Sequence, residues 1–571
     1  MDENKNLLIA VTLSILIFIG WQYFFVPEQP LPQEYQHRTL ATTHASNPQP
    51  TGLILPSAGQ SKQTEEVLSV SSPRLSIDAP ELKGSFALRG MRLDDLELKN
   101  FRQDVDSKSA SIRLLSNGTE KRPFFITFEW VAQDDTTSLP DNAALWTASA
   151  SVLKPDAPVT LTWNNEQGVT FERILSVDKH FLLTIKQRIL NNSAKPITVT
   201  PLAAIEGVPE TDIKGQWTFH EGAVGFIHSA LEEKSFEKMQ HEGSVAFPSE
   251  NGGWAGITEK YWLVAFLAES GKAQTIRYQY IPETQHYRVD AHGNAMTVAP
   301  GETIESVYHF YIGAKNVQLL DKYEDQLGIK HFDLAIDFGY FYFLTRPLFY
   351  ALVYMKDFFG GNMGVCIILL TILIKLLLFP LANRSYRAMS RMRKLQPKVQ
   401  TIQKNYENDK QRLSQELMAL YKREKVNPVG GCLPQLVQFP VLFALYKVFL
   451  VSIEMRHAAM WWIRDLSAPD PLLITNLFGL IPWTPFEFLQ VGIWPIFMGA
   501  TMFVQQKMSP PPADPAQAKV FLFMPIMFTV MMARLPAGLV MYWTWSNILS
   551  IFQQWVVTRL DERHQVKTSR R

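Results

Sequence analysis

Six stretches of this sequence are nearly free of charged residues, and they limit the chain to folds that a lipid bilayer can hold. The first stretch covers residues 7–26, and the other five all lie beyond residue 357. A helix of about twenty residues rises about 30 Å, which is the thickness of the hydrocarbon core of a membrane. The pattern predicts a polytopic α-helical membrane protein with spans at 1–26, 361–382, 429–453, 488–506, 520–535 and 538–558.

The composition of the whole chain conceals this segregation but excludes several classes of protein. A mean hydropathy of −0.04 resembles that of a soluble protein. Because 55 Lys and Arg oppose 54 Asp and Glu, the chain is neither a basic nucleic-acid coat nor an acidic tail-like protein. Two cysteines exclude a disulfide framework and a four-Cys zinc site. We therefore expect no metal and no cofactor.

The first uncharged stretch is either an uncleaved anchor or a cleaved signal peptide. The residues before it, MDENK, are not clearly basic. Its far end contains Trp21, Tyr23 and two phenylalanines, which is typical of an aromatic belt at a membrane interface and not of a small-residue cleavage site. These features favour an anchor.

Lys and Arg concentrate in three of the predicted loops, and this bias predicts the orientation of the chain. Residues 383–428 hold twelve Lys or Arg and four acidic residues, a net charge of 12 − 4 = +8. The loop at 507–519 and the tail at 559–571 are also basic. Cationic loops stay in the cytoplasm. With six spans, both termini are expected in the cytoplasm and residues 27–360 outside it.

The region between the first two spans changes from a linker to a folded β domain. Residues 27–70 are rich in Pro, Gln, Ser and Thr, as flexible linkers are. Residues 71–325 carry short runs of alternating polarity separated by Gly and Pro, which predicts a β-sandwich. The predicted strands lie at 124–130, 159–163, 169–173, 275–280 and 308–312, with a hairpin loop at 164–168.

The remaining segments are assigned from their periodicity and position. Residues 332–360 are expected to form an amphipathic helix in the outer membrane interface, with Leu334, Phe338, Phe341 and Thr345 on one face. Residues 454–487 are expected to be a periplasmic loop. Residues 383–428 are expected to form a cytoplasmic helical hairpin that Pro397 breaks. This hairpin is either a solvated face that sets topology or a cationic arm for ribosomal RNA or anionic lipid.

Polar residues inside the predicted spans are candidates for function. Lys375 lies about 10 Å of helix rise from the cytoplasmic end of its span, and the spans after the first hold no Asp or Glu to neutralise it. It either extends to the inner headgroups or faces a wet cavity open to the cytoplasm. Thr371 lies one turn before it. Further polar positions are Gln435 and Gln438 in the third span and Asn547, Ser550 and Gln554 along one face of the sixth.

Four motifs resemble the YidC membrane-protein insertase family. They are 424–440 (EKVNPVGGCLPQLVQFP), 392–398 (MRKLQPK), 505–510 (QQKMSP) and 20–24 (GWQYF). The likeness covers essentially the whole chain. The chain is similar to the Gram-negative form of the family, which has an extra first span. It implies a periplasmic β-supersandwich and five helices around a hydrophilic groove that opens to cytoplasm and lipid. The segment at 476–487 looks longer than the usual loop of the family, and Arg534 is a further departure.

The resemblance also implies roles for particular residues. The positive charge of the groove, usually Arg, falls on Lys375, with Thr371, Gln438, Asn547, Ser550 and Gln554 as further groove residues. A hydrophobic slide for the substrate maps onto Phe439, Leu442, Phe528, Met531 and Met532. Arg391, Arg393, Lys394 and Lys398 are expected to capture the ribosome or substrate. The implied partners are nascent membrane proteins, the ribosome, the Sec translocon and anionic lipids, and the insertase is expected to work as a monomer without covalent chemistry.

Two other classes of function remain compatible with the residues. A secondary transporter could use a buried lysine as a proton or anion site, although the spans lack internal repeats and acidic relays. A receptor could use the sandwich as a sugar sensor, although the basic loop carries no signalling motif. Proton-coupled uptake and ligand binding by the sandwich, respectively, would distinguish them from an insertase.

Overall fold

The structure, a computed structural model, describes residues 72–569 with short gaps. The gaps are residues 119–121, 134–136, 209–218, 251, 269–271, 407–408, 425, 427–432, 484, 487–488 and 511–514. The expected anchor at 1–26 and linker at 27–70 therefore lie outside the described residues. The chain divides into two compact units, and Pro511–Met524 belongs to the smaller one. All the contacts given below lie within the larger unit.

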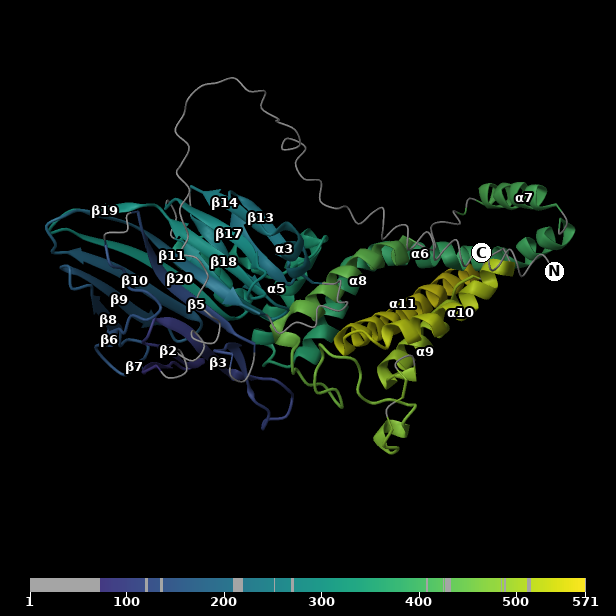
Figure 1. Cartoon of the computed structure of the whole chain (residues 1–571). Helices are drawn as coiled ribbons and strands as arrows, with labels where there is room; N and C mark the ends of the chain where they lie inside the picture. The colour runs from purple at the N-terminus through teal and green to yellow at the C-terminus, as the bar shows by residue number, and fades with distance from the viewer. Residues whose placement is uncertain are drawn as a thin grey trace, which may run out of the picture. The chain divides into compact units, whose positions relative to one another are not determined.

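Two stacked sheets, antiparallel except for the pair of β1 and β7, form the β domain, as the alternating polarity of the sequence predicts (Figure 1). All five predicted strands are present, within β5, β8, β9, β17 and β20. The predicted hairpin loop joins β8 to β9, and Gly168 there has a φ of 88°, a left-handed conformation that glycine adopts without strain. Along β9, every second residue is buried. The alternation places one face of each strand in the core.

The strand order of each sheet is as follows. The eleven-stranded sheet consists of β14 (Ser244–Ser249), β17 (Gln274–Ile281), β18 (His286–Gly293), β11 (Ile197–Gly207), β5 (Phe124–Ala132), β3 (Arg92–Arg102), β2 (Leu82–Ala87), β1 (Arg74–Asp78) and β7 (Val152–Leu153), with β19 (Met296–Val298) beside β11 and β4 (Ser111–Leu115) beside β3. The nine-stranded sheet consists of β13 (Ala230–Ser235), β12 (Gly222–Ile227), β15 (Gly253–Thr258), β16 (Trp262–Ala268), β20 (Thr303–Ala314), β10 (Leu182–Asn191), β9 (Val169–Val177), β8 (Val159–Asn164) and β6 (Thr147–Ala148).

Aromatic side chains fill the space between the two sheets. Phe128 of β5 meets Phe310 of β20 edge to face at 5.2 Å between ring centroids. The next residue, Tyr311, points to the opposite face of β20, where it meets Phe181 at 5.9 Å and Phe332 at 5.4 Å. Edge-to-face pairs add about 0.5–1.5 kcal/mol to the gain from burying their area. The core of the sandwich is thus built from both inner faces, as in other two-layer β domains.

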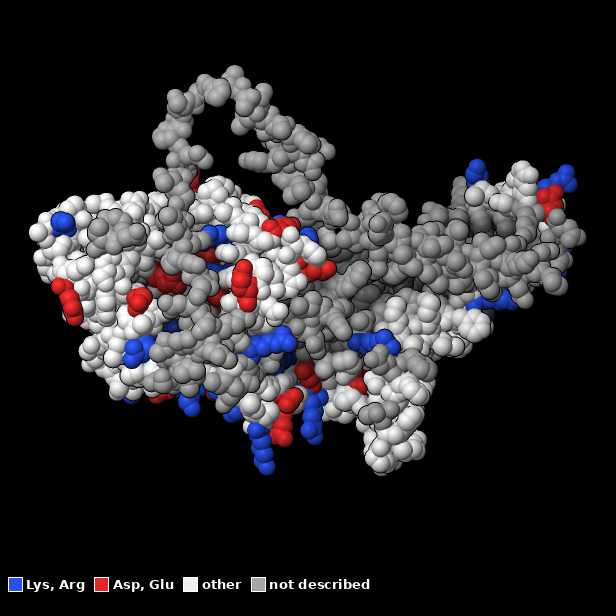
Figure 2. All heavy atoms as spheres, viewed as in Figure 1, with Lys and Arg blue, Asp and Glu red and all other residues white. Residues whose placement is uncertain are grey.

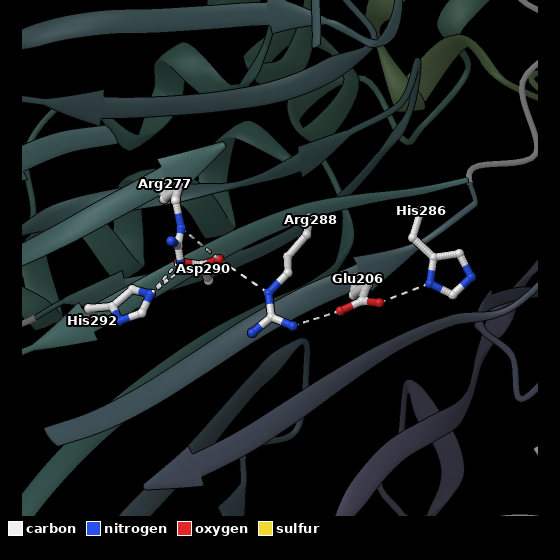
Figure 3. A network of polar contacts seen from close by, with 6 residues as sticks. All are labelled: Glu206, Arg277, His286, Arg288, Asp290 and His292. Atoms are coloured by element: carbon white, nitrogen blue, oxygen red, sulfur yellow. Dashed lines mark hydrogen bonds and ion pairs between the residues drawn. The ribbon is translucent and has the colours of Figure 1, made fainter. Parts of the chain in front are cut away.

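A network of charged side chains lies on the outer face of the eleven-stranded sheet (Figure 3). Arg288 joins two carboxylates, at 2.9 Å to Glu206 and 3.1 Å to Asp290. His286 lies 2.9 Å from Glu206, and His292 lies 2.8 Å from Asp290. Arg277 approaches Asp290 as well, at 3.2 Å. Asp290 is fully buried and Glu206 nearly so, which makes the cations around them necessary for folding.

Helices follow the sandwich from residue 317 onward. They are α4 (Val317–Leu327), α5 (Tyr342–Phe358), α6 (Met363–Asn405), α7 (Lys410–Arg423), α8 (Leu433–Val451), α9 (Ile493–Met508), α10 (Pro515–Met532) and α11 (Ala537–Ser569), and the sandwich itself holds α3 (Phe236–Glu242). Short 3₁₀ turns lie at η1 (Phe332–Ala335), η3 (Ile453–Met455) and η4 (Leu477–Gly479). By length and composition, α6 is the one helix of the described part that suffices to cross a membrane; shorter apolar helical stretches lie at Val437–Val451 and Ala518–Met532.

The expectation that Pro397 breaks the cytoplasmic hairpin is wrong. Helix α6 continues through Pro397 to Asn405, and the turn of the hairpin comes after it, before α7. A proline removes one backbone hydrogen bond, which a long helix can absorb as a local kink. Leu395 and Val399 on either side of the proline are both buried, so packing holds the helix together there. Helix α11 extends to Ser569 and so includes most of the expected basic tail at 559–571.

The expected amphipathic helix at 332–360 begins about ten residues later than its pattern predicts. Leu334 lies in η1, and α5 starts only at Tyr342. Between them Gly339 adopts a φ of 69°, and Asp337 accepts a hydrogen bond from the backbone N–H of Gly339 at 2.9 Å. This turn separates Leu334 and Phe338 from the helix that contains Thr345.

Polar contacts join the end of the sandwich to the helices. Asp337 accepts a hydrogen bond from the backbone of His220 at 2.9 Å and pairs with Lys447 of α8 at 2.7 Å. Glu454 accepts a bond from Asn316 at 2.9 Å and also pairs with Lys356 of α5. These contacts fasten the end of the sandwich to α5 and α8.

Arg288 offers a test of the outer-face network. Replacing Arg288 with Met should lower the free energy of unfolding of the sandwich by about 3 kcal/mol, because two buried carboxylates lose a shared cation. The urea midpoint of the full-length protein in detergent, followed by near-UV circular dichroism, measures the change. The matched control is Lys186→Met. Lys186 forms an exposed ion pair with Glu305 at 3.0 Å, so its loss should lower the free energy of unfolding by only about 0–1 kcal/mol. Equal losses in the two variants would contradict this account.

The same network should make the sandwich sensitive to acid. Burial alone raises the pKa of Glu206 and of Asp290, but hydrogen bonds from His286 and His292 and the charge of Arg288 outweigh it, and both pKa values fall below their ordinary values of 4.5 and 3.8. A carboxylate with a lowered pKa stabilises the fold above its unfolded pKa and ceases to do so as the pH falls through its folded pKa. The urea midpoint should therefore drop below pH 4.5, and Glu206→Gln should weaken that dependence.

Candidate functional site

A small polar cleft lies among helices α6, α8, α9 and α11. Its volume is about 40 Å³, which has room for ordered water molecules but not for a peptide. The residues that line it are mostly polar or aromatic, and none of them is acidic: Lys375, Leu378, Leu381, Ala382, Tyr386, Val437, Gln438, Gln505, Trp543, Ser546, Asn547, Ser550 and Gln553.

The ammonium group of Lys375 is held by neutral acceptors. Its Nζ donates to the hydroxyl of Ser550 on α11 at 2.9 Å and to the amide oxygen of Gln438 on α8 at 3.4 Å. Gln438 in turn donates its amide N–H to the hydroxyl of Tyr542. The cation therefore has hydrogen-bond partners without a counter-charge among the lining residues, and its charge stays available to an anionic group that enters the cleft.

One face of α11 supplies most of the polar groups. Trp543, Ser546, Asn547, Ser550 and Gln553 recur at spacings of three and four residues, so they project from the same side of the helix. Gln553 donates to the side chain of Asn383 at 2.9 Å, and Asn547 donates to Thr501 at 3.2 Å. These bonds tie α11 to α6 on one side and to α9 on the other.

Four of the six groove residues expected from the sequence line this cleft, and two do not. Lys375, Gln438, Asn547 and Ser550 are brought together. The hydroxyl of Thr371 is fully buried and donates to the carbonyl of Ile367 at 2.6 Å within its own helix. Gln554 points to α9, where it donates to the carbonyl of Met508 at 3.1 Å. The side chain of Gln435 lies outside the described residues.

Sequence reasoning missed several lining residues. Gln553 lies three residues after Ser550 and was overlooked in favour of its neighbour Gln554. Tyr386 lies beyond the predicted end of its span, at 382, because α6 continues without interruption. Helical spacing could have found both, because Gln553 lies one turn after Ser550 and Tyr386 lies three turns after Lys375.

The residues expected to form the hydrophobic slide divide into exposed and buried ones. Phe439 and Met531 are exposed, whereas Leu442 and Met532 are buried. Phe528 is half-buried and meets Trp543 at 5.6 Å, beside the cleft. Further exposed apolar side chains lie next to these residues on the same helices: Phe443 on α8 and Ile526, Met527 and Val530 on α10.

The expected capture residues lie on the second half of α6. Arg391, Arg393, Lys394 and Lys398 are all exposed. Lys398 pairs at 2.7 Å with Glu424, the residue that follows α7, so this pair links the two arms of the hairpin. The turn residues Asp409 and Arg412 make a hydrogen bond that begins α7.

A second cleft, of about 260 Å³, lies in the sandwich between β4 and β5 of one sheet and β15 and β16 of the other. Its lining is mixed: apolar side chains such as Ile112, Phe124 and Val264 lie beside the charged side chains of Arg113, Arg122 and Glu259. In the ranges that the structure covers, no group of three or more His, Cys, Asp or Glu is placed to hold a metal ion. Cys366 is a free, buried thiol.

The fold and the cleft define a class: a helical membrane protein with a polar site among its helices and a β domain attached. The chain matches the family described as YidC periplasmic domain over residues 74–351 and the family described as 60Kd inner membrane protein over residues 354–564. The "Membrane protein insertase YidC" of Rickettsia bellii (strain OSU 85-389) is 44% identical over 98% of this chain and 100% of its own length. The protein of the same name from Methylobacterium radiotolerans is 40% identical over 98% of this chain and 95% of its own length.

The chain belongs to the YidC family of membrane protein insertases. Members act in the inner membrane, carry a periplasmic domain and are not enzymes. A solved structure described as an active YidC insertase with its first transmembrane domain resolved is 17% identical over 84% of this chain and 92% of that chain, with a TM-score of 0.36. A galactose mutarotase related enzyme from Lactobacillus acidophilus covers 42% of this chain at 10% identity and a TM-score of 0.31. Likenesses of this size do not bear on activity.

Proposed function

We propose that the cleft around Lys375 receives the hydrophilic tail of a nascent membrane protein while the apolar segment of the same substrate passes into lipid beside it. The observation that carries this proposal is the set of neutral acceptors around Lys375 Nζ, which solvate the ammonium but leave its charge uncompensated. A tail in a hydrated groove avoids the hydrocarbon, where each unsatisfied polar group costs several kcal/mol. A slightly acidic tail gains the attraction of the lysine as well.

The cleft is narrow in this conformation, which bears on how a tail would enter. A volume of about 40 Å³ has room for water molecules only. The tail must therefore displace water and separate α8 from α11, which meet through Gln438 and Tyr542. The hydrogen bonds of Lys375 to Gln438 and Ser550 are then exchanged for bonds to the tail, so the ammonium is not left without partners at any step.

The apolar part of the substrate would leave along α8 and α10. Phe439, Phe443, Ile526, Met527, Val530 and Met531 expose large apolar side chains there, as lipid-facing residues do. Methionine is flexible and polarizable, so it adapts to substrates of different shape. Burial of the substrate segment in lipid supplies the driving force. Leu442 and Met532, which are buried, support this surface from behind.

The full proposal includes the topology and the partners. Six spans place both termini and the 383–428 hairpin in the cytoplasm, and the sandwich in the periplasm. The hairpin cations contact the ribosome or anionic lipid, and the insertase works alone or beside the Sec translocon. A transporter that uses Lys375 as a proton site is the alternative, but the described cleft offers no acidic group for a proton relay.

Substitution of Lys375 tests the role of the groove charge. An anion about 4 Å from an ammonium gains about 1 kcal/mol in bulk water and about 4 kcal/mol near a protein surface. A hydrated groove lies between these limits, so Lys375→Leu and Lys375→Glu should slow insertion of an acidic-tailed substrate by about tenfold or more. Lys375→Arg should insert it nearly normally, because a passing peptide needs the charge and not a fixed geometry. The measurement is insertion of one small substrate whose tail carries graded charge.

Ser550→Ala is the matched control for this series. It removes an acceptor of Lys375 but keeps the charge, and should therefore retain most of the preference for acidic tails. Insertase levels must be equal in all variants. If Lys375→Leu inserts every tail normally, the lysine serves only to reach the headgroups, and the groove proposal is wrong.

Neutralising the hairpin tests ribosome capture. Replacing Arg391, Arg393, Lys394 and Lys398 by Gln should weaken ribosome co-sedimentation and reduce the slope of log affinity against log salt by about 0.7–0.9 for each phosphate that the hairpin no longer neutralises. The control is four Gln substitutions at exposed lysines of the sandwich, Lys83, Lys108, Lys154 and Lys179, which change the net charge equally. Identical binding by the two variants would leave the hairpin cations with a topological role alone.

A further inference from the structure

The described residues of the segment 471–492, here called the apolar lobe, expose more large apolar side chains than their position in a loop requires. No charged residue occurs from 471 to 486. Leu480 is 81% exposed, Phe486 70% and Leu477 51%, and Phe478, Ile481 and Trp483 are exposed as well. Figure 2 shows a white protrusion there without blue or red on the visible face. Exposed apolar side chains gathered in this way mark an interaction site.

The backbone of the lobe is largely satisfied by its own hydrogen bonds. The N–H of Ile474 donates to Val491 at 3.2 Å, and the N–H groups of Phe478 and Ile481 donate to Leu473 and Asn476 at 2.9 and 3.1 Å. The indole of Trp483 donates to the carbonyl of Thr475 at 3.3 Å. A segment with such internal bonding can enter an apolar medium, because few polar groups need water.

The base of the lobe is anchored to the start of α9. Asp470 is buried and accepts hydrogen bonds from the backbone of Trp494 at 2.8 Å and from the indole of Trp462 at 3.0 Å. The rings of Trp461 and Trp462 stack on that of Trp494, at 5.4 and 5.7 Å. Gly492 lies against Asp470, where a Cβ would come within 2.6 Å of it. The exposed side chains therefore extend from a segment whose base is held in place by hydrogen bonds and stacked rings.

We infer that the apolar lobe lies in the outer leaflet of the membrane, with its exposed side chains among the lipid acyl chains. The chain enters the lobe from the end of α8 and leaves it into α9, so both ends lie at the outer ends of proposed spans. Figure 1 shows the lobe, in yellow-green, projecting to the side of the helices and not along them. Tryptophans at its base match the aromatic belt that proteins place at headgroup depth. The inference rests on the topology proposed above.

A second protein is the other kind of occupant that such a surface fits. The lipid assignment is favoured because the lobe lacks the mixture of charged rim and apolar centre that is typical of protein interfaces. The charges nearest the uncharged run are Asp470, which precedes the lobe, and Glu487, which lies in its last part. Asp470, moreover, is buried at the base, where its carboxylate already accepts hydrogen bonds from Trp462 and Trp494.

Nitroxide labels in the full-length protein test the inference. In a background with Cys366→Ala and Cys432→Ala, one label replaces Leu480, and two controls carry it at exposed apolar positions: Leu145 in the sandwich and Phe552 on α11. The protein is placed in bilayers of phosphatidylethanolamine and phosphatidylglycerol without substrate. The labels at Leu480 and Phe552 should both collide more often with oxygen, which concentrates in lipid, than with a water-soluble nickel chelate. The label at Leu145 should show the reverse.

The outcomes separate this inference from the proposed function. A label at Leu480 that behaves like that at Leu145 would overturn the membrane position of the lobe, and so would one shielded from both reagents, since that indicates a protein contact. Failure of the Phe552 control would instead contradict the proposed topology of α11. A second pair of variants guards against misfolding: with the label at Leu477, Leu480→Glu should reverse the oxygen preference and Leu480→Met should keep it. Neither readout depends on insertion activity.

Discussion

An ammonium group among apolar helices must be solvated by the protein, and much of the helical region follows from this requirement. Lys375 has Ser550 and Gln438 as acceptors, and each of these residues stands on a different helix. To supply them, α11 turns a polar face inward and exposes apolar residues such as Phe552 and Trp555 elsewhere. A helix in lipid would normally do without such a face. The cost of an unsolvated cation explains why these helices are arranged around it.

The strands of the sandwich were predictable because their signal is local. Alternation along 169–173 or 275–280 reports which face is buried, and Asn and Gly between two such runs report a hairpin. The helix boundaries were harder to predict from the sequence. Pro397 and Gly339 look alike in sequence, as breakers, yet the helix continues through the first and not the second. The difference lies in tertiary contacts: Leu395 and Val399 are packed, whereas Gly339 turns around Asp337.

The candidate site was partly predictable for a related reason. A lone charge in an uncharged run identifies Lys375 from sequence alone. Sequence spacing then places Asn547 and Ser550 on one face but does not decide between Gln553 and Gln554, which lie about 100° apart around the helix. Thr371 shares a face with Lys375, but its hydroxyl bonds to its own helix, an option that serine and threonine always have in helices. The network around Arg288 joins side chains from separate strands, so no local pattern predicts it.

The continuity of α6 makes the hairpin and the groove mechanically one body. Lys375 and Lys398 are 23 residues apart on a single helix, about 35 Å along its axis. No loop separates the proposed capture residues from Lys375, so a displacement of the hairpin arm is carried along the helix toward the cleft. Pro380 and Pro397 are the positions at which α6 can bend, since each lacks one backbone hydrogen bond. Pro380 lies five residues from Lys375, so bending there redirects the ammonium relative to α8 and α11. Under the proposed function, one helix thus carries both the residues that capture a partner and the lysine of the cleft.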